Sequence, residues 1–478
     1  MHIKEKISNA ALIPAIKPEE TVALDDNGTP DWAGGLIFAQ VRIATATEEG
    51  TLRSAVTVLE HYAEMGVNAL WICPVYDPGR EGNGYSNLGP HTVDPSITGT
   101  PDYGKGWQEV KRFVDEAHRR NIRILLDLIS WGTVKGAPLR QEHPDWYTGL
   151  DEWGGDAFDW QNPEFREWYI QTAVNIVTVT GCDGFRYDVE PRYAGYTVDR
   201  EIRDRLHSLG RKPFMMSESG NERRKTYDCE QIGVTNSIPG YFEEKPVYYF
   251  IDRFNLVDSI KLGVNIGSGL WKTKNCGCEH RYYVNTVTCH DHRFPVVKGN
   301  RLAIGYQAIF SPFIPQWYMG EEWNNPLDIV PGNGDRVLYF NKINWDAADI
   351  PENEAFYEDV KKMIRIRRSY PEIFSFFPPH FKDINICKVY SEGGGLQAYA
   401  RYVDSTALLI LPNVYGRPKL LSVEVPFEEM CFDTGGLYTV ADAVSGEVLL
   451  RGDCESIKTF ELTVGPVDQR IIEIRKIK

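Results

Sequence analysis

The segment GCDGFRYD, residues 181–188, is the part of the sequence that most directly decides the fold. Its apolar and aromatic residues are typical of a buried β-strand, and the segment ends on a carboxylate, Asp188. In α/β barrels the chemistry lies at the carboxyl ends of the strands. We therefore expect the residues before Asp188 to belong to the core and its carboxylate to project into the rim of a barrel.

Similar short apolar runs recur along the chain from about residue 34 to residue 375. They alternate with amphipathic helical stretches such as residues 107–120 and 162–177, a pattern that predicts a parallel sheet with crossover helices. Seven runs at this spacing favour a closed (β/α)₈ (TIM) barrel over an open sheet. The predicted strands are LIFAQV from Leu36, NALWICPVY from Asn68, RILLDLI from Arg123, DGFRYDV from Asp183, PFMMSES from Pro213, VNTVTCHD from Val284 and PQWYMG from Pro315.

Two other regions depart from the barrel pattern. From residue 379 to residue 478 the sequence consists of short alternating strands and turns, which predicts a separate antiparallel β-sandwich domain. Residues 130–161, after the third strand, are rich in Gly, Pro and Trp and show no clear secondary structure. On a barrel this long loop would lie at the carboxyl-terminal rim, and we interpret it as a short inserted region within a catalytic barrel of residues 1–378.

Charge and composition exclude several classes of protein. A formal net charge of −15 disfavours a nucleic-acid partner and suits a neutral ligand such as a sugar. No apolar stretch is long enough for a membrane span, and no signal peptide is evident, so we expect a cytoplasmic protein, or a secreted one if a signal peptide has been removed. The nine cysteines, with Cys276 and Cys278 as the one close pair, predict free thiols rather than a zinc site.

Three carboxylates end predicted strands: Asp188, Glu218 and Asp291. Cleavage of a glycoside with retention needs two carboxyl groups about 5–5.5 Å apart, one as nucleophile and one as acid. Arg186, two residues before Asp188 and on the same strand face, would keep that aspartate ionised. The apolar residues before Glu218 are consistent with a partly desolvated acid. A single strand-end carboxylate is often only a salt-bridge partner or a helix cap, but three on separate strands favour catalysis.

These segments resemble the α-amylase superfamily of glycoside hydrolases (family thirteen). GCDGFRYDVEP is similar to the strand that carries the family's nucleophile, MMSES to the segment that holds its acid/base, and VTCHDHR to its N-H-D segment, with Cys289 in place of Asn. Residues 68–129 resemble the second and third strands with the helix between them, and YMGEEWN, residues 318–324, resembles the eighth. The resemblance runs from about Leu36 to the end of the chain.

The resemblance implies a role for each matching residue. Asp188 would form the covalent glycosyl-enzyme, Glu218 would act as acid and then base, and Asp291 would bind sugar hydroxyls and stabilise the transition state. Further residues would contact the substrate or hold the nucleophile; they are Tyr85, which would stack on the sugar, Asp127, Arg186 and His290.

The sequence is an atypical member at LDLISWG, residues 126–132, where Trp131 and Gly132 occupy positions that are usually Asn and His. Without the Asn, the calcium site common in α-amylases loses a ligand, so we expect no cofactor or metal. Trp131 would replace the lost His by stacking on the sugar, or would obstruct the pocket. Arg192, after the nucleophile, and Arg336, in the GNGDR loop, are further candidate sugar ligands, although each could equally be a surface residue.

Three functions follow from these residues. The leading hypothesis is hydrolysis of α-glucosidic bonds in oligosaccharides or starch-like glucans through a covalent intermediate. Transglycosylation uses the same intermediate and differs only in the acceptor. A non-catalytic amylase-like sugar-binding protein is the third, suggested by the missing Asn and His, but such proteins normally lose carboxylates as well. Linkage preference, chain length and oligomeric state do not follow from the sequence.

Overall fold

The computed structural model describes residues 22, 28–80, 82–188, 197–218, 229–232, 240–242, 245–247, 257, 260, 282–286, 289–290, 300–325 and 341–477. The chain divides into two compact units. The first consists of Met1–Gln231 with Leu327–Trp345, and the second of Ile232–Pro326 with Asp346–Lys478. Asp188 and Glu218, two of the three predicted catalytic carboxylates, lie in the first unit.

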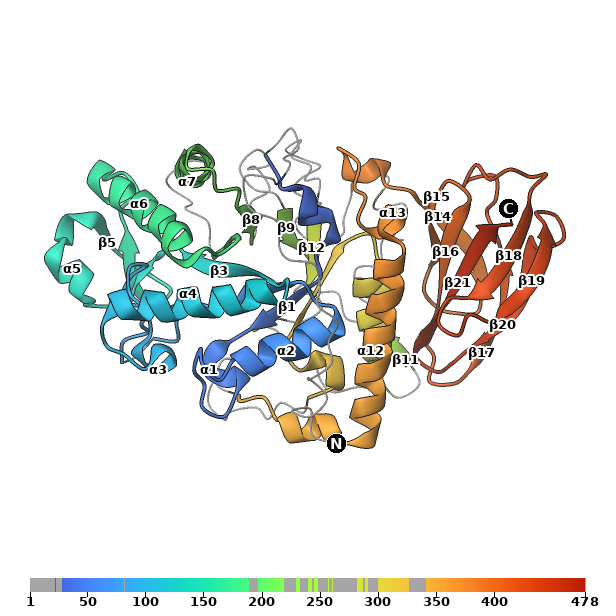
Figure 1. The fold of residues 1–478 in the computed structure, drawn as a ribbon, viewed down its shortest axis with the longest axis horizontal. Helices are drawn as coiled ribbons and strands as arrows, with labels where there is room; N and C mark the ends of the chain where they lie inside the picture. The colour runs from blue at the N-terminus through green and yellow to red at the C-terminus, as the bar shows by residue number, and fades with distance from the viewer. Residues whose placement is uncertain are drawn as a thin grey trace. The chain divides into compact units, whose positions relative to one another are not determined.

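Parallel strands form the sheet of the first unit (Figure 1). Each strand pairs with the next along the chain, and the register places Asp127 opposite Arg186 and Arg186 opposite Met216. Strands β7 and β8 approach closely at Gly184, where a Cβ atom would lie 1.9 Å from the carbonyl oxygen of Phe214. The strands, in the order in which they pair, are β1 (Phe38–Val41), β2 (Ala69–Ile72), β3 (Arg123–Ile129), β7 (Gly184–Asp188), β8 (Phe214–Ser217) and β9 (Cys229–Ile232).

Strands β12 (Tyr282–Thr286) and β13 (Ile314–Tyr318) form a parallel pair in the second unit. The strand order over the described residues is that of a closed barrel, β1-β13-β12-β9-β8-β7-β3-β2. The predicted (β/α)₈ barrel is therefore confirmed, and each of the seven predicted runs overlaps a strand. The eighth, β9, was missed because its sequence, CEQI, is short and lacks a run of apolar residues.

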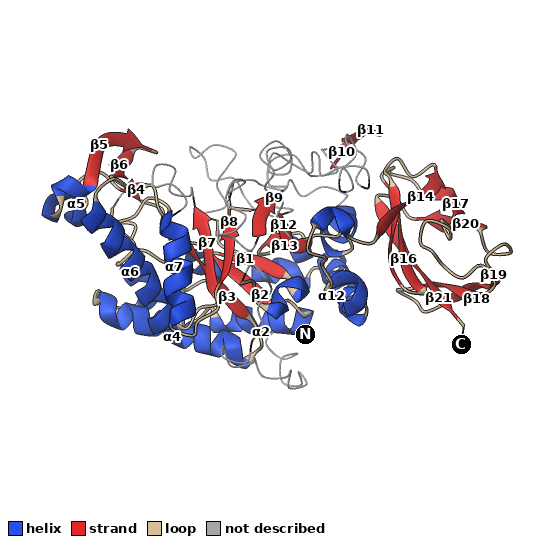
Figure 2. Ribbon diagram, turned by 90° about the horizontal axis from the view of Figure 1, so that it is seen from above, coloured by secondary structure: helices blue, strands red, loops and turns tan. Residues whose placement is uncertain are grey.

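Helices α2, α4, α6 and α7 lie side by side in chain order in the first unit (Figures 1 and 2). Helix α6 begins where the Asn162 side chain accepts hydrogen bonds from the backbone N–H groups of Glu164 and Phe165, with Pro163 at the first helical position. The helices of this unit are α1 (Ile43–Ala46), α2 (Val56–Met65), α3 (Pro95–Thr98), α4 (Tyr103–Arg119), α6 (Pro163–Thr180), α7 (Thr197–Ser208) and the 3₁₀ turn η3 (Asp31–Gly35).

The second unit carries its own helices. The long helix α12 and the short helix α13 are the last α-helices before the strands of the C-terminal domain. The elements are α11 (Asn300–Leu302), the π-helix η5 (Ala303–Ile309), η6 (Glu321–Trp323), α12 (Pro351–Ser369), α13 (Pro371–Phe374), η9 (Phe381–Asp383) and the hairpin of β10 (Gly240–Phe242) with β11 (Lys245–Val247); η8 (Trp345–Asp349) begins at the unit boundary.

The segment 130–161 is more regular than the sequence indicated. It contains a three-stranded antiparallel sheet of order β4-β6-β5, built from β4 (Gly132–Thr133), β5 (Tyr147–Glu152) and β6 (Gly155–Phe158). The helix α5 (Pro138–Glu142) and the turn η4 (Pro144–Trp146) precede β5. No strand was predicted in this segment because β4 has only two residues and β5 is largely exposed, so neither shows the alternation of a half-buried strand.

The C-terminal domain is an eight-stranded antiparallel sheet within the described residues, of order β19-β18-β21-β16-β15-β14-β17-β20. Strand β14 pairs with β15 through Ile386–Val389 and with β17 through Tyr390–Glu392, so the sheet folds over at this strand. One apolar core joins the two halves, which confirms the predicted β-sandwich. The strands are β14 (Ile386–Glu392), β15 (Ala398–Val403), β16 (Thr406–Asn413), β17 (Lys419–Glu424), β18 (Leu437–Asp442), β19 (Val448–Asp453), β20 (Thr459–Val464) and β21 (Asp468–Lys476).

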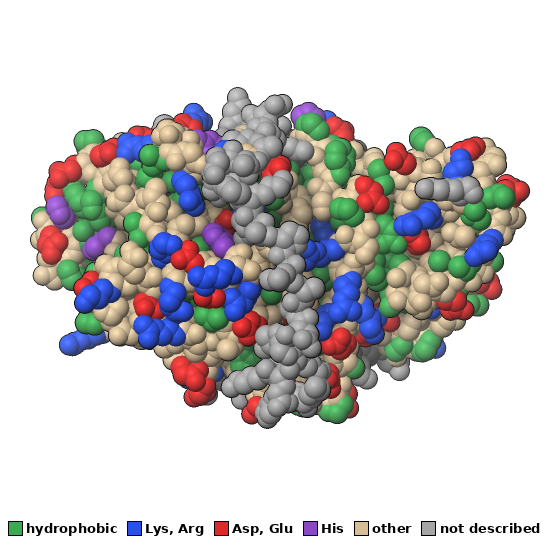
Figure 3. Space-filling view, viewed as in Figure 1, with side chains coloured by type: hydrophobic (Ala, Val, Ile, Leu, Met, Phe, Trp, Pro, Cys, Tyr) green, Lys and Arg blue, Asp and Glu red, His purple; other side chains and the backbone are tan. Residues whose placement is uncertain are grey.

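The surface and the cysteines agree with an ordinary folded chain. Figure 3 shows acidic and basic side chains interspersed over the face that it presents. Within the described residues, no helix is both long and apolar enough to cross a membrane. Cys73, Cys182, Cys431 and Cys454 are free thiols, as the sequence predicted.

Candidate active site

Arg186 is the centre of a buried cluster of carboxylates. Its Nη1 atom lies 3.0 Å from Oδ1 of Asp127 and 2.7 Å from Oδ1 of Asp188, and its Nη2 atom lies 3.1 Å from Oε1 of Glu218. The guanidinium is 2% exposed. Burial works to lower the pKa of Arg186, but the charges of Glu218, Asp127 and Asp188 raise it well above its usual value. One permanent cation therefore holds carboxylates from three adjacent strands together.

Asp127 accepts hydrogen bonds on both of its carboxylate oxygens. Its Oδ2 atom accepts from the Trp71 indole and from the Tyr85 hydroxyl, both at 2.7 Å, while its Oδ1 atom faces Arg186. Burial raises the pKa of Asp127 to about 6, although Arg186 and the two donors oppose this shift. Every oxygen of this side chain is occupied, so Asp127 positions Arg186 and Tyr85 rather than offering a free carboxylate.

The indole of Trp71 also supports the cation directly, since its ring lies under the guanidinium with the Cζ atom of Arg186 4.6 Å from the ring centroid. The Tyr76 hydroxyl donates to the backbone oxygen of Asp127 at 2.7 Å. The sequence interpretation missed both residues. A buried Asp in the middle of an apolar strand requires donors from neighbouring strands, and the aromatic residues of NALWICPVY were the available ones.

Asp188 occupies the last position of β7. Its side chain is 11% exposed, and its contact with Arg186 is the shortest of the three. Burial raises the pKa of Asp188 well above its usual range; the Arg186 charge opposes the shift, and Glu218 and Asp127 add to it. Ionisation of Asp188 therefore depends on Arg186.

Glu218 follows β8 directly and differs from the other two carboxylates in its access to solvent. Its side chain is 35% exposed, although it shares Arg186 with Asp188. A group that exchanges protons with a leaving group and then with water needs such access. The two predicted reacting carboxylates thus bind neighbouring nitrogens of one guanidinium, one side chain buried and the other reachable from solvent.

Trp131 joins the inserted segment to this cluster. Its Nε1 atom donates to the backbone oxygen of Tyr85 at 3.2 Å, and its backbone oxygen accepts from Phe158. The side chain packs against β6 so closely that a Cβ atom at Gly155 would lie 2.8 Å from the ring. Trp131 is 5% exposed, so most of the ring serves packing, and its contact with a sugar stays a prediction.

The residues at this position do not fit the calcium ion of α-amylases. Trp131 offers an indole N–H where the family has an oxygen ligand, and that N–H is used by Tyr85. Within the described part of the chain, no three His, Cys, Asp or Glu side chains gather in a way that could hold a metal ion. That the protein needs no metal remains a prediction.

The structure brings together five of the predicted site residues: Tyr85, Asp127, Arg186, Asp188 and Glu218. His290 is buried in the second unit, 2% exposed. Three other predicted residues lie outside the described residues, namely Asp291, Arg192 and Arg336.

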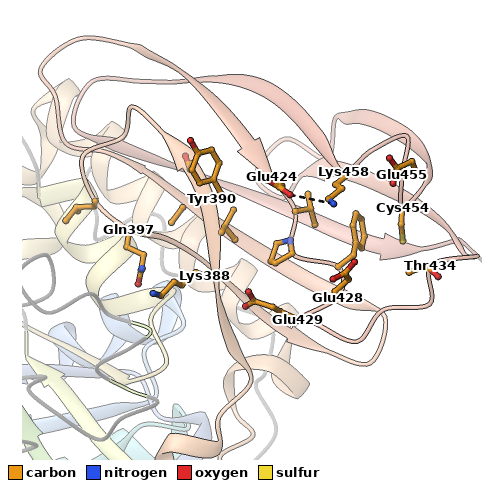
Figure 4. Close-up of a pocket in the computed structure, with 17 residues that line it drawn as sticks. Lys388, Tyr390, Gln397, Glu424, Glu428, Glu429, Thr434, Cys454, Glu455 and Lys458 are labelled. Atoms are coloured by element: carbon orange, nitrogen blue, oxygen red, sulfur yellow. Dashed lines mark ion pairs between the residues drawn. The ribbon is translucent and has the colours of Figure 1, made fainter.

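A separate cavity of about 670 Å³ lies in the C-terminal domain (Figure 4). Carboxylates from Glu424, Glu428 and Glu429 reach its edge, and Glu424 faces Lys458 at 3.7 Å. None of the predicted site residues lines this cavity, so it is distinct from the cluster around Arg186.

The chain is similar to known proteins that act on α-glucans. Residues 27–135 match the catalytic domain of α-amylases. The chain is 29% identical over 385 residues to a malto-oligosyltrehalose trehalohydrolase of Arthrobacter ramosus, covering 68% of this chain and 66% of that protein. It is 34% identical over 236 residues to an oligo-1,6-glucosidase of Heyndrickxia coagulans, covering 38% and 41%. The chain thus spans less than two thirds of the length of each of these relatives.

Solved structures show the same fold. A noncanonic maltogenic α-amylase of Thermotoga neapolitana superposes with a TM-score of 0.65 at 17% identity, covering 92% of this chain and 99% of that one. A debranching enzyme of Nostoc punctiforme superposes with a TM-score of 0.63 at 18% identity, covering 93% and 99%. These likenesses show that the chain has the fold of the α-amylases, and its residues 27–135 match the catalytic domain of that family of glycoside hydrolases.

Proposed function

We propose that this protein is a retaining glycoside hydrolase that cleaves α-glucosidic bonds in oligosaccharides or starch-like α-glucans. The observation that carries the proposal is the shared guanidinium of Arg186, which binds Asp188 from β7 and Glu218 from β8. Retention requires a nucleophile and an acid on carboxyl groups about 5–5.5 Å apart. Two carboxylates held on one guanidinium are consistent with that requirement.

The first step forms the covalent intermediate. A carboxylate oxygen of Asp188 attacks the anomeric carbon while the bond from that carbon to the leaving oxygen breaks. The leaving oxygen takes the electron pair of the broken bond and a proton from the Glu218 carboxyl. Arg186 opposes the rise in the pKa of Asp188 that burial causes, and because that pKa is still raised, the activity is expected to fall on the acid side as Asp188 takes up a proton.

The second step releases the sugar. Glu218, now a carboxylate, takes a proton from a water molecule whose oxygen bonds to the anomeric carbon, and the ester bond to Asp188 breaks. The partial exposure of Glu218 supports this role because the water must reach it from solvent. Asp291 would bind sugar hydroxyls, with Tyr85 and His290 in the same subsite and Arg192 and Arg336 further out.

The substrate is proposed as a class rather than as one linkage. The relatives include a malto-oligosyltrehalose trehalohydrolase and an oligo-1,6-glucosidase, whose names indicate different substrates. The net charge of −15 suits a neutral carbohydrate substrate. No feature of the described residues favours transfer over hydrolysis.

The test combines anomeric analysis with matched variants. Wild-type protein acting on α-1,4, α-1,6 and α-1,1 glucosides should release the α-anomer first, as read by NMR; release of the β-anomer first would contradict retention. Glu218→Gln should lose far more activity on an unactivated oligosaccharide than on an aryl α-glucoside, whose leaving group needs no proton. Glu164→Gln, at an exposed carboxylate on α6, is the control and should match wild type on both substrates.

A further inference from the structure

The hairpin of β5 and β6 carries two exposed apolar side chains, one in β5 and one at the turn. Leu150 is 67% exposed and Trp153 is 66% exposed. Glu152 pairs with Gly155, so Trp153 and Gly154 are the two central residues of the turn, with φ angles of 53° and 82°. A side chain in the left-handed region costs roughly 1–2 kcal/mol, and Asn or Gly is the usual choice there. Trp153 therefore has a large side chain in a backbone conformation that disfavours side chains, and this side chain is exposed to solvent.

The hairpin is held in a defined conformation. Asp151 accepts a hydrogen bond from the backbone N–H of Gly154 at 3.0 Å and forms an ion pair with Lys135 at 2.5 Å. Asp156 accepts from the backbone N–H of Gly136 at 3.0 Å, which ties β6 to the segment before α5. Contacts on both sides therefore fix the direction in which the turn projects.

The base of the same hairpin is connected to the catalytic cluster. Gly155 lies against the ring of Trp131, and the indole of Trp131 donates to the backbone of Tyr85. The hydroxyl of Tyr85 in turn donates to Asp127, which holds Arg186. The strand β4 starts three residues after β3 ends, so the small sheet begins at the carboxyl end of a barrel strand, where the reaction takes place.

The chemistry of the tip fits a sugar better than a protein. Sugar rings present apolar C–H faces that pack on an aromatic ring, and polar groups at the edge then bind their hydroxyls. Asp151 and Glu152 directly precede Trp153 in the sequence, and both are at least partly exposed. Two apolar side chains offer far less than the roughly 800 Å² that each partner contributes to a stable protein interface.

We propose that Trp153 is an outer binding site for one sugar ring of an α-glucan whose reacting end occupies the site of Asp188 and Glu218. This inference rests on the proposed function. The outer site contributes only when the chain is long enough to reach from the reacting carboxylates to the hairpin, so it determines chain-length preference and takes no part in bond cleavage.

The test compares Trp153→Asn with wild type and with a control. Asn suits the turn conformation, so the variant should fold at least as well as wild type. The KM for long maltodextrins should rise about tenfold, equivalent to 1.4 kcal/mol of binding. Its kcat, and both constants for an aryl α-glucoside, should stay unchanged. Trp153→Tyr should restore most of the long-chain KM, and Phe376→Ala, at an aromatic residue 60% exposed in the second unit, should match wild type.

The outcomes separate the outer site from the proposed function. Turnover of both substrates with an unchanged KM for long chains in Trp153→Asn would overturn the outer site alone. Failure of wild type to cleave any α-glucoside would overturn the proposed function. Migration in native gels containing soluble starch gives a second readout that needs no turnover: Trp153→Asn should be retarded less than wild type and Phe376→Ala, and equal retardation of all three would overturn the outer site.

Discussion

The two ends of strand β7 each hold a buried aspartate, and the two have opposite properties. Asp183 precedes the strand and accepts hydrogen bonds from His118, from Arg123 and from the backbone N–H of Ile124, each at 2.8 Å. Burial works to raise the pKa of Asp183, but His118 and Arg123 together lower it below its usual value. Asp188 ends the strand, shares one arginine with two other carboxylates, and has a raised pKa because of its burial.

The opposite pKa shifts of Asp183 and Asp188 indicate a different role for each end of the strand. At Asp183 the donors satisfy the carboxylate, so its charge stabilises the fold. At Asp188 the negative charges outnumber the single cation, an arrangement that stabilises nothing by itself but leaves a carboxylate poised to react. In a (β/α)₈ barrel, residues at the amino-terminal face usually stabilise the fold, and residues at the carboxyl-terminal face usually carry out catalysis. Asp183 and Asp188 follow this division.

The largest effect is expected from Asp188→Asn. Loss of the nucleophile should lower kcat/KM for an aryl α-glucoside by about 10⁴-fold or more. The free energy of unfolding should stay the same or rise, since one of the crowded negative charges is removed. Steady-state kinetics and urea denaturation measure the two effects. A strongly destabilised Asp188→Asn protein would contradict the conclusion that Asp188 does not stabilise the fold.

Asp183→Asn should show the reverse pattern. Removing the carboxylate leaves the buried Arg123 and the His118 ring without their partner, which should lower the free energy of unfolding by about 3 kcal/mol. Turnover by the remaining folded protein should be near that of wild type. Asp115→Asn, which removes an exposed ion pair with Lys111, is the control and should cost less than about 1 kcal/mol. Equal losses in the two variants would show that burial at Asp183 does not matter.

Trp71→Phe tests the support of the catalytic end. It keeps an aromatic ring under Arg186 but removes the 2.7 Å hydrogen bond to Asp127, which should cost about 1.5 kcal/mol, the usual value for a hydrogen bond to a charged group. Tyr85 and Arg186 still hold Asp127, so kcat should fall only severalfold. A loss of activity as large as that of Asp188→Asn would mean that Trp71 takes part in the reaction.

The smallest effect, and the one with a pH signature, is expected from His118→Gln. Burial works to lower the pKa of His118, but Asp183 raises it above its usual value. Because the pKa of His118 is higher in the folded protein than in the unfolded chain, its protonation stabilises the fold. This stabilisation is complete at a pH below the pKa in the unfolded chain, and it is lost as the pH rises through the pKa in the folded protein. The variant should therefore be less stable than wild type by about 1 kcal/mol at pH 6 and by less at pH 9, as measured by urea unfolding. A difference independent of pH would show that His118 acts only through packing.

The strands at either side of the site were predictable because their apolar runs are long enough to be distinct, as RILLDLI and GCDGFRYD show. The sequence predicted Asp188 and Glu218 because each ends a strand, and Arg186 because it lies two residues before Asp188 on the same strand face. The structure brings these three side chains together. Trp71 and Tyr76 could not be singled out, since an aromatic residue inside a strand has the same pattern whether it fills the core or donates to a carboxylate. The strands β5 and β9 were missed because pairing with neighbouring strands in the folded chain, rather than local alternation of apolar and polar residues, defines them.

The divided pairing of β14 has a consequence for how the C-terminal domain comes apart. Its first half bonds to β15 and its second half to β17, so neither half of the sandwich can open while the other remains intact without breaking this strand. Backbone amides on both sides should then exchange their hydrogens through the same cooperative opening rather than in two separate steps. A single strand thereby makes the domain one unfolding unit.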